Sequence, residues 1–237
     1  MTDPVLQLRH APIVEAVVDI DCDMPVGLDL SGLEMRARER FSNDYPKVQT
    51  KFLHEEDSEI DALLFLKGDE RQIIQVRRGG FSFNRLAPYS SLDDYLPEIE
   101  RTWKRFVELT MPVQIRRIVL RYINRIFLPL VEGTVDLDDY LLLGPRLSDE
   151  HRLTLLTFFD RYSAVESSTH HEINVSLLMQ PPEAGRLPVI FDLEALHHTS
   201  GEPSAWQNVR ETILSLRRLK NDVFRKTLTE RCLNLFR

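Results

Sequence analysis

Three carboxylates lie on one face of a strand-like segment near the start of the sequence. Residues 11–21 read APIVEAVVDID, and strand side chains alternate between two faces, which sends Glu15, Asp19 and Asp21 to the same side. The opposite side is apolar and carries Val14, Ala16, Val18 and Ile20. Because Mg²⁺ prefers oxygen ligands, the three carboxylates are candidate metal ligands.

Three arginines share one face of a second strand-like segment. Residues 116–126 read RRIVLRYINRI, and the same alternation puts Arg117, Arg121 and Arg125 opposite an apolar side. Arg77, in a neighbouring strand-like run, is placed to join them. Guanidinium groups bind phosphate and carboxylate through paired hydrogen bonds, so these four arginines are candidate ligands of an anion.

Two interpretations of these charged faces stay open. If the two segments pack about a pseudo-twofold axis, the acidic and basic faces meet in a charged cleft, where arginines hold an anionic group and carboxylates hold Mg²⁺. A solvated sheet face, or a network of ion pairs between the two halves of the chain, would show the same pattern. The second interpretation is favoured, because charged faces are usually solvated.

Two histidine pairs are a weaker candidate for a metal site. They are His170-His171 and His197-His198, with Glu172 and Glu194 nearby. Neighbours on a strand point to opposite faces, so each pair supplies at most one ligand, and His170 with Glu172 is the natural same-face combination. Exposed or hydrogen-bonded histidines are therefore favoured. The sequence contains no P-loop, dinucleotide glycine pattern or serine-hydrolase elbow.

Basic residues outnumber acidic ones in the C-terminal segment. They are Arg210, Arg217, Arg218, Lys220, Arg225, Lys226, Arg231 and Arg237, against Glu211, Asp222 and Glu230. Contact with nucleic-acid phosphates is one interpretation. The segment lacks the interleaved aromatic residues of a single-strand platform, so a solvated helix face is favoured.

The composition predicts a cytoplasmic protein with a large core. The chain has 237 residues, of which 43% are hydrophobic, and a net charge of −7 that argues against non-specific attraction to nucleic acid. No apolar run approaches the roughly 20 residues that span a bilayer, and the N-terminus lacks a signal-peptide pattern. Cys22 and Cys232 are expected to be buried free thiols.

Periodicity and turn residues predict the order of the elements. The first half is expected to contain a strand at 12–22, a helix at 32–42, strands near 48–56, 61–67 and 71–86, and a helix at 92–110. The second is expected to contain a strand at 115–128, a short helix near 136–143, strands near 157–167, 170–179 and 187–196, and a helix at 205–220, with residues 147–156 ambiguous. Capping boxes predict helix starts at Ser31 with Glu34, Ser204 with Gln207, and Thr227 with Glu230. Turns are expected at Gly79-Gly80 and at 180–185.

An internal similarity at an offset of about 110 residues indicates a duplication. Residues 81–86 read FSFNRL and residues 191–196 read FDLEAL, and the same offset carries the apolar helix positions Ile99, Trp103 and Phe106 onto Val209, Ile213 and Leu216. We therefore expect an α+β fold of two related β-α-β-β-β-α halves, with antiparallel sheets packed against long helices. The halves are residues 1–112 and 113–237, in one compact pseudo-symmetric unit in which Trp103 and Phe106 are buried.

The arrangement resembles a sporadically distributed bacterial family of uncharacterised proteins of about this length. The resemblance is carried by the API-x-E-A-V opening at 11–17, the FSFNRL segment, the L-R-Y-I-N-R-I strand at 120–126, and a C-terminal segment with VF-x-x-x-LT at 223–229. The family pattern more often has His and Glu near the positions of Leu219 and Arg225. The resemblance implies an accessory gene, in a stress or phage-conflict system.

The sequence thus favours a non-catalytic binding or assembly protein that carries a charged cleft between its halves and acts with a protein partner. The four candidate arginines have the chemistry to bind an anionic ligand. Neither nucleic acid nor a membrane is the expected partner. Two alternatives stay open: a metal-dependent phosphohydrolase or nuclease using Mg²⁺, and a nucleic-acid-binding protein using the basic C-terminal helix.

Overall fold

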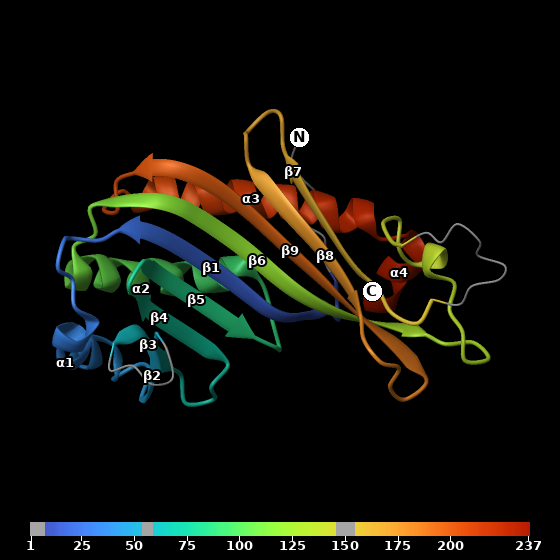
Figure 1. Ribbon diagram of the computed structural model, residues 1–237, viewed down its shortest axis with the longest axis horizontal. Helices are drawn as coiled ribbons and strands as arrows, with labels where there is room; N and C mark the ends of the chain where they lie inside the picture. Colours follow the sequence, from blue (N-terminus) through green and yellow to red (C-terminus); the bar gives the residue numbers. More distant parts are fainter. Residues whose placement is uncertain (1–7, 54–58, 146–154) are drawn as a thin grey trace. The chain divides into compact units, whose positions relative to one another are not determined.

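The computed structural model describes residues 8–53, 59–145 and 155–237, and it is an α+β fold with a nine-stranded sheet (Figure 1). The strand order is β2-β3-β4-β5-β1-β6-β9-β8-β7. The strands are β1 Ile13–Asp23, β2 Lys47–Phe52, β3 Ile60–Leu66, β4 Gln72–Arg77, β5 Gly80–Leu86, β6 Gln114–Pro129, β7 Phe159–Val165, β8 Glu172–Met179 and β9 Arg186–Gly201. The helices are α1 Leu30–Phe41, α2 Leu92–Thr110, α3 Trp206–Thr227 and α4 Glu230–Leu233, with the 3₁₀ turns η1 Leu137–Asp139 and η2 Asn234–Phe236. The predicted α+β class, with antiparallel strands packed against long helices, is confirmed, with one nine-stranded sheet in place of separate sheets.

The chain forms two compact units, each of which combines segments that are distant in sequence. Unit 1 comprises Met1–Val14, Arg121–Ala195 and Ser215–Arg237, and unit 2 comprises Glu15–Leu120 and Leu196–Leu214. The expected division at residues 112 and 113 follows chain order instead and stays a prediction. In the part of the chain that the structure describes, no helix is both long enough and apolar enough to span a membrane.

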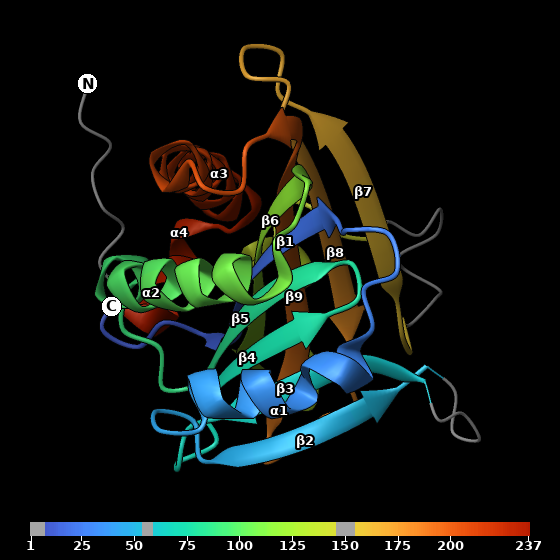
Figure 2. The same ribbon diagram turned by 90° about the vertical axis from the view of Figure 1, so that its left-hand side faces the viewer.

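The core of unit 2 lies between strands β3–β5 and the helices α1 and α2, which pack on the same face (Figure 2). Trp103 and Phe106 of α2 are 1% and 0% exposed, which confirms the predicted apolar stripe. Their rings contact Phe81 of β5 at centroid distances of 5.7 and 5.6 Å. The Trp103 indole N–H donates to the Pro203 carbonyl at 3.1 Å, so its polar atom is satisfied as well.

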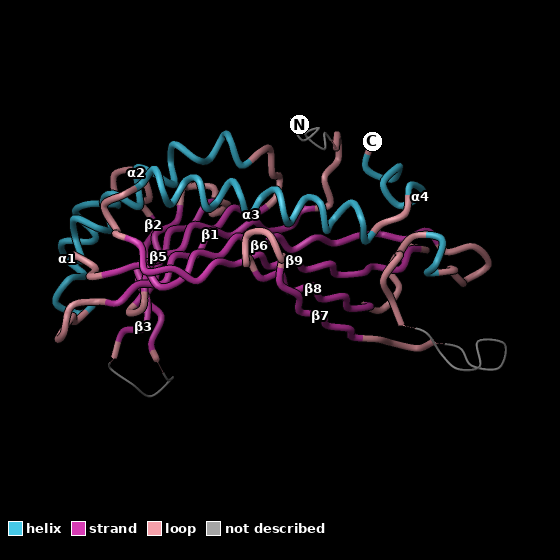
Figure 3. Tube along the Cα trace, turned by 90° about the horizontal axis from the view of Figure 1, so that it is seen from above, coloured by secondary structure: helices cyan, strands magenta, loops and turns pink. Residues whose placement is uncertain are grey.

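The core of unit 1 lies between its part of the sheet and the helices α3 and α4. Phe191 of β9 is fully buried and stacks on Phe224 of α3 at a centroid distance of 5.6 Å. Figure 3 shows these helices on one face of β6, β8 and β9. No described helix covers the other face of unit 1, which we call its open face. The open face carries side chains from alternate positions of β6, β7, β8 and β9, among them Arg121, Arg161, Asn174 and Asp192.

Helix starts differ from the predicted capping boxes. Asp29, not Ser31, caps α1 and accepts hydrogen bonds from the amides of the next turn. Thr229, not Thr227, caps α4, because α3 runs on to Thr227, past the expected end at 220. Ser91 caps α2 at the expected start. A side-chain oxygen caps a helix only from the residue before its first turn, so a shift of two residues removes the motif.

Two predicted turns are confirmed, and one predicted helix is shorter than expected. Gly80 joins β4 to β5 with φ 148°, and a Cβ there would lie 2.1 Å from the carbonyl oxygen of Ile20, so only glycine fits. Ala184 and Gly185 have φ 48° and 73°, as a two-residue hairpin turn requires. The helix expected near 136–143 is only the 3₁₀ turn η1. The ambiguous segment 147–156 lies mostly outside the described residues.

Candidate binding site

The predicted charged residues of unit 2 form ion pairs with one another. Nη2 of Arg77 lies 3.2 Å from Oδ1 of Asp19 and 3.0 Å from Oδ1 of Asp21. Nη2 of Arg117 lies 2.7 Å from Oδ2 of Asp21. The side chains of both aspartates are about one quarter exposed, so water screens these pairs only in part.

The three candidate metal ligands are each occupied by protein donors. Glu15 accepts from Nδ2 of Asn84 at 2.7 Å, Asp19 accepts from the hydroxyl of Ser82, and Asp21 is shared by two arginines. Within residues 8–53, 59–145 and 155–237, no three His, Cys, Asp or Glu side chains are grouped as metal ligands. Arginine, amide and hydroxyl donors satisfy these carboxylates in the structure.

The two other candidate arginines lie in unit 1 and have different partners. Arg121 forms a fork with Asp192 of β9, in which Nε lies 3.0 Å from Oδ1 and Nη2 lies 2.6 Å from Oδ2. Nε of Arg125 donates to Gln180 at 2.8 Å, and Nη2 lies 2.7 Å from Glu183. The four arginines are thus placed in two sets, with Arg77 and Arg117 in unit 2 and Arg121 and Arg125 in unit 1.

A hollow of about 340 Å³ opens on the open face of unit 1 beside the Arg121–Asp192 fork. Its charged and polar lining consists of Arg121, Arg161, Asn174, Ser176, Asp192 and Glu194, and its apolar lining of Phe159, Leu178 and Ile190. Asn174 donates to Glu194 at 2.9 Å and accepts from the Ser163 hydroxyl at 2.7 Å, which fixes its orientation. Arg161 is exposed and forms no ion pair with any described residue. The hollow therefore offers a guanidinium group beside an apolar surface.

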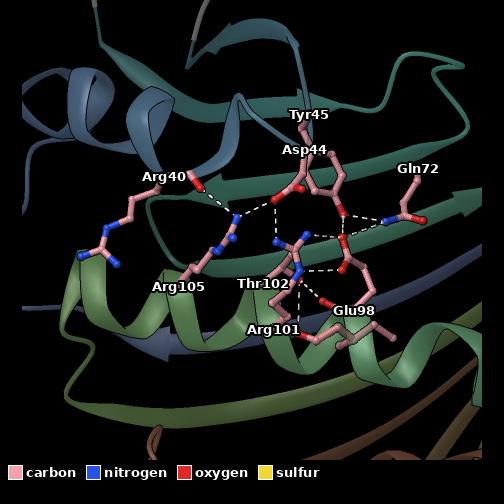
Figure 4. Close-up of polar contacts among 9 residues, drawn as sticks. Arg40, Asp44, Tyr45, Gln72, Glu98, Arg101, Thr102 and Arg105 are labelled. Atoms are coloured by element: carbon pink, nitrogen blue, oxygen red, sulfur yellow. Dashed lines mark hydrogen bonds and ion pairs between the residues drawn. The ribbon is translucent and has the colours of Figure 1, made fainter.

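A second polar network lies on the helix side of unit 2 (Figure 4). The hydroxyl of Tyr45, which is fully buried, donates to Glu98 at 2.6 Å and accepts from Gln72 at 2.5 Å. Burial raises the pKa of Glu98, but the hydrogen bonds from Arg101 and Tyr45 lower it by a larger amount. The pKa of Glu98 therefore lies below its usual value. Arg101 and Arg105 both bind Asp44, at 2.5 and 2.8 Å. The network joins α2 to the α1–β2 loop and to β4, and its role is structural.

The histidines do not form the predicted same-face pair with Glu172. His170 has φ 57°, which places it in a left-handed turn before β8, so it does not share the alternation of that strand. His171 is buried, and its Nε2 lies 2.9 Å from the Ser215 hydroxyl. The strand expected from residue 170 thus begins only at Glu172.

Several basic residues of the C-terminal segment are held in ion pairs. Lys226 lies 2.8 Å from Asp222, Arg231 lies 2.6 Å from Asp139, and Arg237 lies 3.0 Å from Glu230. Lys220 is buried, and its Nζ lies 3.8 Å from the centroid of the Tyr122 ring. These cations are engaged within unit 1, which weakens the case for a phosphate-binding tail.

Sequence reasoning missed Asp192, Asn174 and Arg161, all of which line the hollow. The signal that could have found Asp192 was present, since alternation along FDLEAL puts Asp192 and Glu194 on the face opposite Phe191. Arg161 carries no such signal, because nearly every side chain of β7 is exposed on both faces.

Comparison with known proteins gives no family for this chain. No family model matches it, and no curated protein matches it. Among solved structures, the chain is similar to Methanococcus jannaschii TBP, at 13% identity and a TM-score of 0.29, with 88% of this chain and 99% of that chain covered. A likeness of this degree carries no conclusion about function.

Proposed function

We propose that this protein is a non-catalytic binding protein that takes a protein partner on the open face of unit 1. The observation that carries the proposal is the hollow of about 340 Å³ that combines a fixed arginine fork, an exposed arginine and an apolar wall. Concave surfaces with apolar walls and a few placed polar groups are where proteins bind ligands. A hollow of this volume suits a side chain or two of a polypeptide.

The lining defines the chemistry of the partner segment. Arg161 is exposed and free of ion pairs among the described residues, so it can bind a carboxylate through its fork. Phe159 and Leu178 are 64% and 39% exposed, and covering them would remove apolar surface from water. The segment we propose therefore carries an acidic residue close to an aromatic or aliphatic one.

The binding function is favoured over a metal-dependent phosphohydrolase by the donors around the β1 carboxylates. A metal would have to displace the guanidinium groups of Arg77 and Arg117 from Asp19 and Asp21. Removing one partner from a partly buried charge pair is costly. The existing ion pairs thus support a structural role for these carboxylates.

The proposal is tested with a displayed library of random linear peptides panned against the immobilised protein. We expect selected peptides to share an acidic residue next to an aromatic or aliphatic one. Arg161→Gln should weaken the binding of a selected peptide about tenfold, the loss of one charge-assisted contact. Arg186→Gln is the matched control, because Arg186 is an exposed arginine of unit 1 that does not line the hollow. Equal binding by both variants would overturn the proposal.

We propose further that the two halves of the chain are related by duplication. From β1 the sheet continues outward with β5, β4, β3 and β2, and from β6 it continues outward with β9, β8 and β7, so each half runs in reverse chain order. A long helix follows the last strand of each half in the chain: α2 follows β5, and α3 follows β9. Apolar positions related by the offset of 110, such as Phe81 with Phe191 and Trp103 with Ile213, are buried in both halves. An experimental structure in which residues 81–106 fail to superpose on residues 191–216 would contradict this.

The family resemblance supports an accessory gene, and the two buried free cysteines support a cytoplasmic location.

A further inference from the structure

Strand β7 lies at one end of the strand order, and it differs from β2 at the other end. Natural sheets protect their edges with lysines and bulges. β2 carries both, with Lys47 and Lys51 along its six residues and a register shift at Lys51 and Phe52. β7 reads FDRYSAV, carries no lysine or proline, and keeps an unbroken register with β8 over all seven residues.

The backbone groups of β7 that point away from the sheet can be identified from its pairing with β8. Two hydrogen bonds flank the strand, from the amide of Met179 to the carbonyl of Phe158 and from the amide of Glu166 to the carbonyl of His171. In an antiparallel ladder the residues alternate between those whose backbone groups face the partner strand and those whose groups face away. The even-numbered residues of β7 therefore bond to β8. The backbone groups of Phe159, Arg161, Ser163 and Val165 point away from the sheet.

The side chains of the outward residues are apolar at both ends of the strand. Phe159 is 64% exposed and Val165 is 59% exposed. Between them lie Arg161 and Ser163. An edge strand with apolar ends and outward backbone groups that form no strand pairing with other described residues is a template for another strand.

We infer that β7 pairs with β7 of a second copy of this chain, antiparallel and centred on Tyr162. In that register Phe159 faces Val165 of the other copy, and Arg161 faces Ser163, twice each by symmetry. On the other face Asp160 lies opposite Ala164, and Tyr162 lies opposite its own copy. The register joins apolar to apolar side chains and sets no like charges against each other.

Neighbouring symmetric registers are disfavoured by charge. A pairing centred on Arg161 sets two guanidinium groups directly opposite each other. A pairing centred on Ser163 sets Asp160 opposite Glu166 and leaves Phe159 without a partner inside the strand. Like charges in directly opposed positions destabilise a strand pair. The sequence of β7 is thus self-complementary in one register, which is what argues for a second copy as the occupant.

The inference is tested by sedimentation equilibrium of the full chain between about 1 and 200 µM, the range in which moderate self-association is resolved. We expect a monomer–dimer equilibrium. Ser163→Pro removes an outward N–H without removing a bond to β8 and should weaken the dimer at least about tenfold. Ser163→Ala, which loses the same hydroxyl contact with Asn174 but keeps the N–H, should dimerise like the wild type.

A second pair of variants tests the register without proline. Ser163→Lys places a cation opposite Arg161 of the other copy and should weaken the dimer about three- to tenfold relative to Ser163→Ala. Adding Arg161→Glu should restore it, because the opposed charges then attract. A wild type that stays monomeric over the whole range, or a dimer unaffected by Ser163→Lys, would overturn the inference. The inference does not rest on the proposed partner binding, which Arg121→Ala tests without changing β7.

Discussion

Lys220 is a buried cation on α3 whose surroundings act in two directions. Burial, followed by the nearby charge of Arg217, lowers its pKa from 10.5 to about 7. The Tyr122 ring lies within cation–π distance and favours the charged form. Because the folded-state pKa is the lower one, the unfolded chain binds more protons between about pH 7 and pH 10.5. Burying the charged Lys220 lowers the free energy of unfolding by the full amount below about pH 7. This loss of stability shrinks as the pH rises through the window and is absent above about pH 10.5.

Replacing Lys220 by Met should therefore stabilise the protein most at low pH. We expect the free energy of unfolding to rise by about 1–3 kcal/mol near pH 6, the order of the cost of burying a polar group, and the gain to be smaller near pH 9.5. Denaturant unfolding of both proteins at the two pH values measures this. Lys226→Met is the control, since the Lys226 side chain is 75% exposed on the same helix. A gain that does not change with pH would contradict the buried-charge explanation.

Tyr45 holds a polar network inside unit 2. Replacing Tyr45 by Phe removes a donor to Glu98 and the acceptor that Gln72, 3% exposed, uses for its amide. An unsatisfied buried polar group costs about 1–3 kcal/mol, so we expect the free energy of unfolding to fall by that amount. Tyr95→Phe is the control, because the Tyr95 hydroxyl accepts an exposed hydrogen bond from Ser90, and it should cost less than about 1 kcal/mol. Equal effects in urea denaturation would show that the network is dispensable.

At the scale of elements, the β4–β5 turn shows how one backbone position fixes a strand. A Cβ on Gly80 would lie 2.1 Å from the Ile20 carbonyl oxygen of β1, whereas a Cβ on Gly79 would meet nothing within 4 Å. We expect Gly80→Ala to cost about 3 kcal/mol or more, from strain at positive φ and from displacement of β1. Gly79→Ala should cost less than about 1 kcal/mol. Comparable melting temperatures for the two variants would place the turn elsewhere.

Local patterns predicted most elements because the elements are locally determined. The alternation of β1 and the apolar stripe of α2 are each visible within one short segment of the sequence. Helix α2 accordingly spans the expected residues 92–110. The partners of Arg121 and Arg125 were not predictable in this way. Asp192 lies 71 residues from Arg121, so the contact depends on which strand follows β6 in the sheet. Strand order is set by non-local packing, which one sequence does not reveal.

At the scale of the whole molecule, charged pairs serve two purposes that the sequence could not separate. Arg77 and Arg117 are held by the β1 aspartates on unit 2, where they join strands of the sheet. The Arg121–Asp192 fork has the same chemistry but lies in the wall of the hollow. Position on the sheet, rather than residue type, therefore separates a pair that joins strands from a pair that can meet a partner.

The Arg121–Asp192 fork tests this distinction directly. The side chain of Arg121 is 40% exposed, so Arg121→Ala should lower the free energy of unfolding by only about 1 kcal/mol. The same change should weaken the binding of a library-selected peptide about tenfold, because the wall of the hollow loses its fixed guanidinium. Arg186→Ala should change neither quantity. If the fork is purely structural, the outcome reverses: unfolding becomes easier by about 3–5 kcal/mol, as when a buried charge loses its partner, and peptide affinity in the folded variant stays the same.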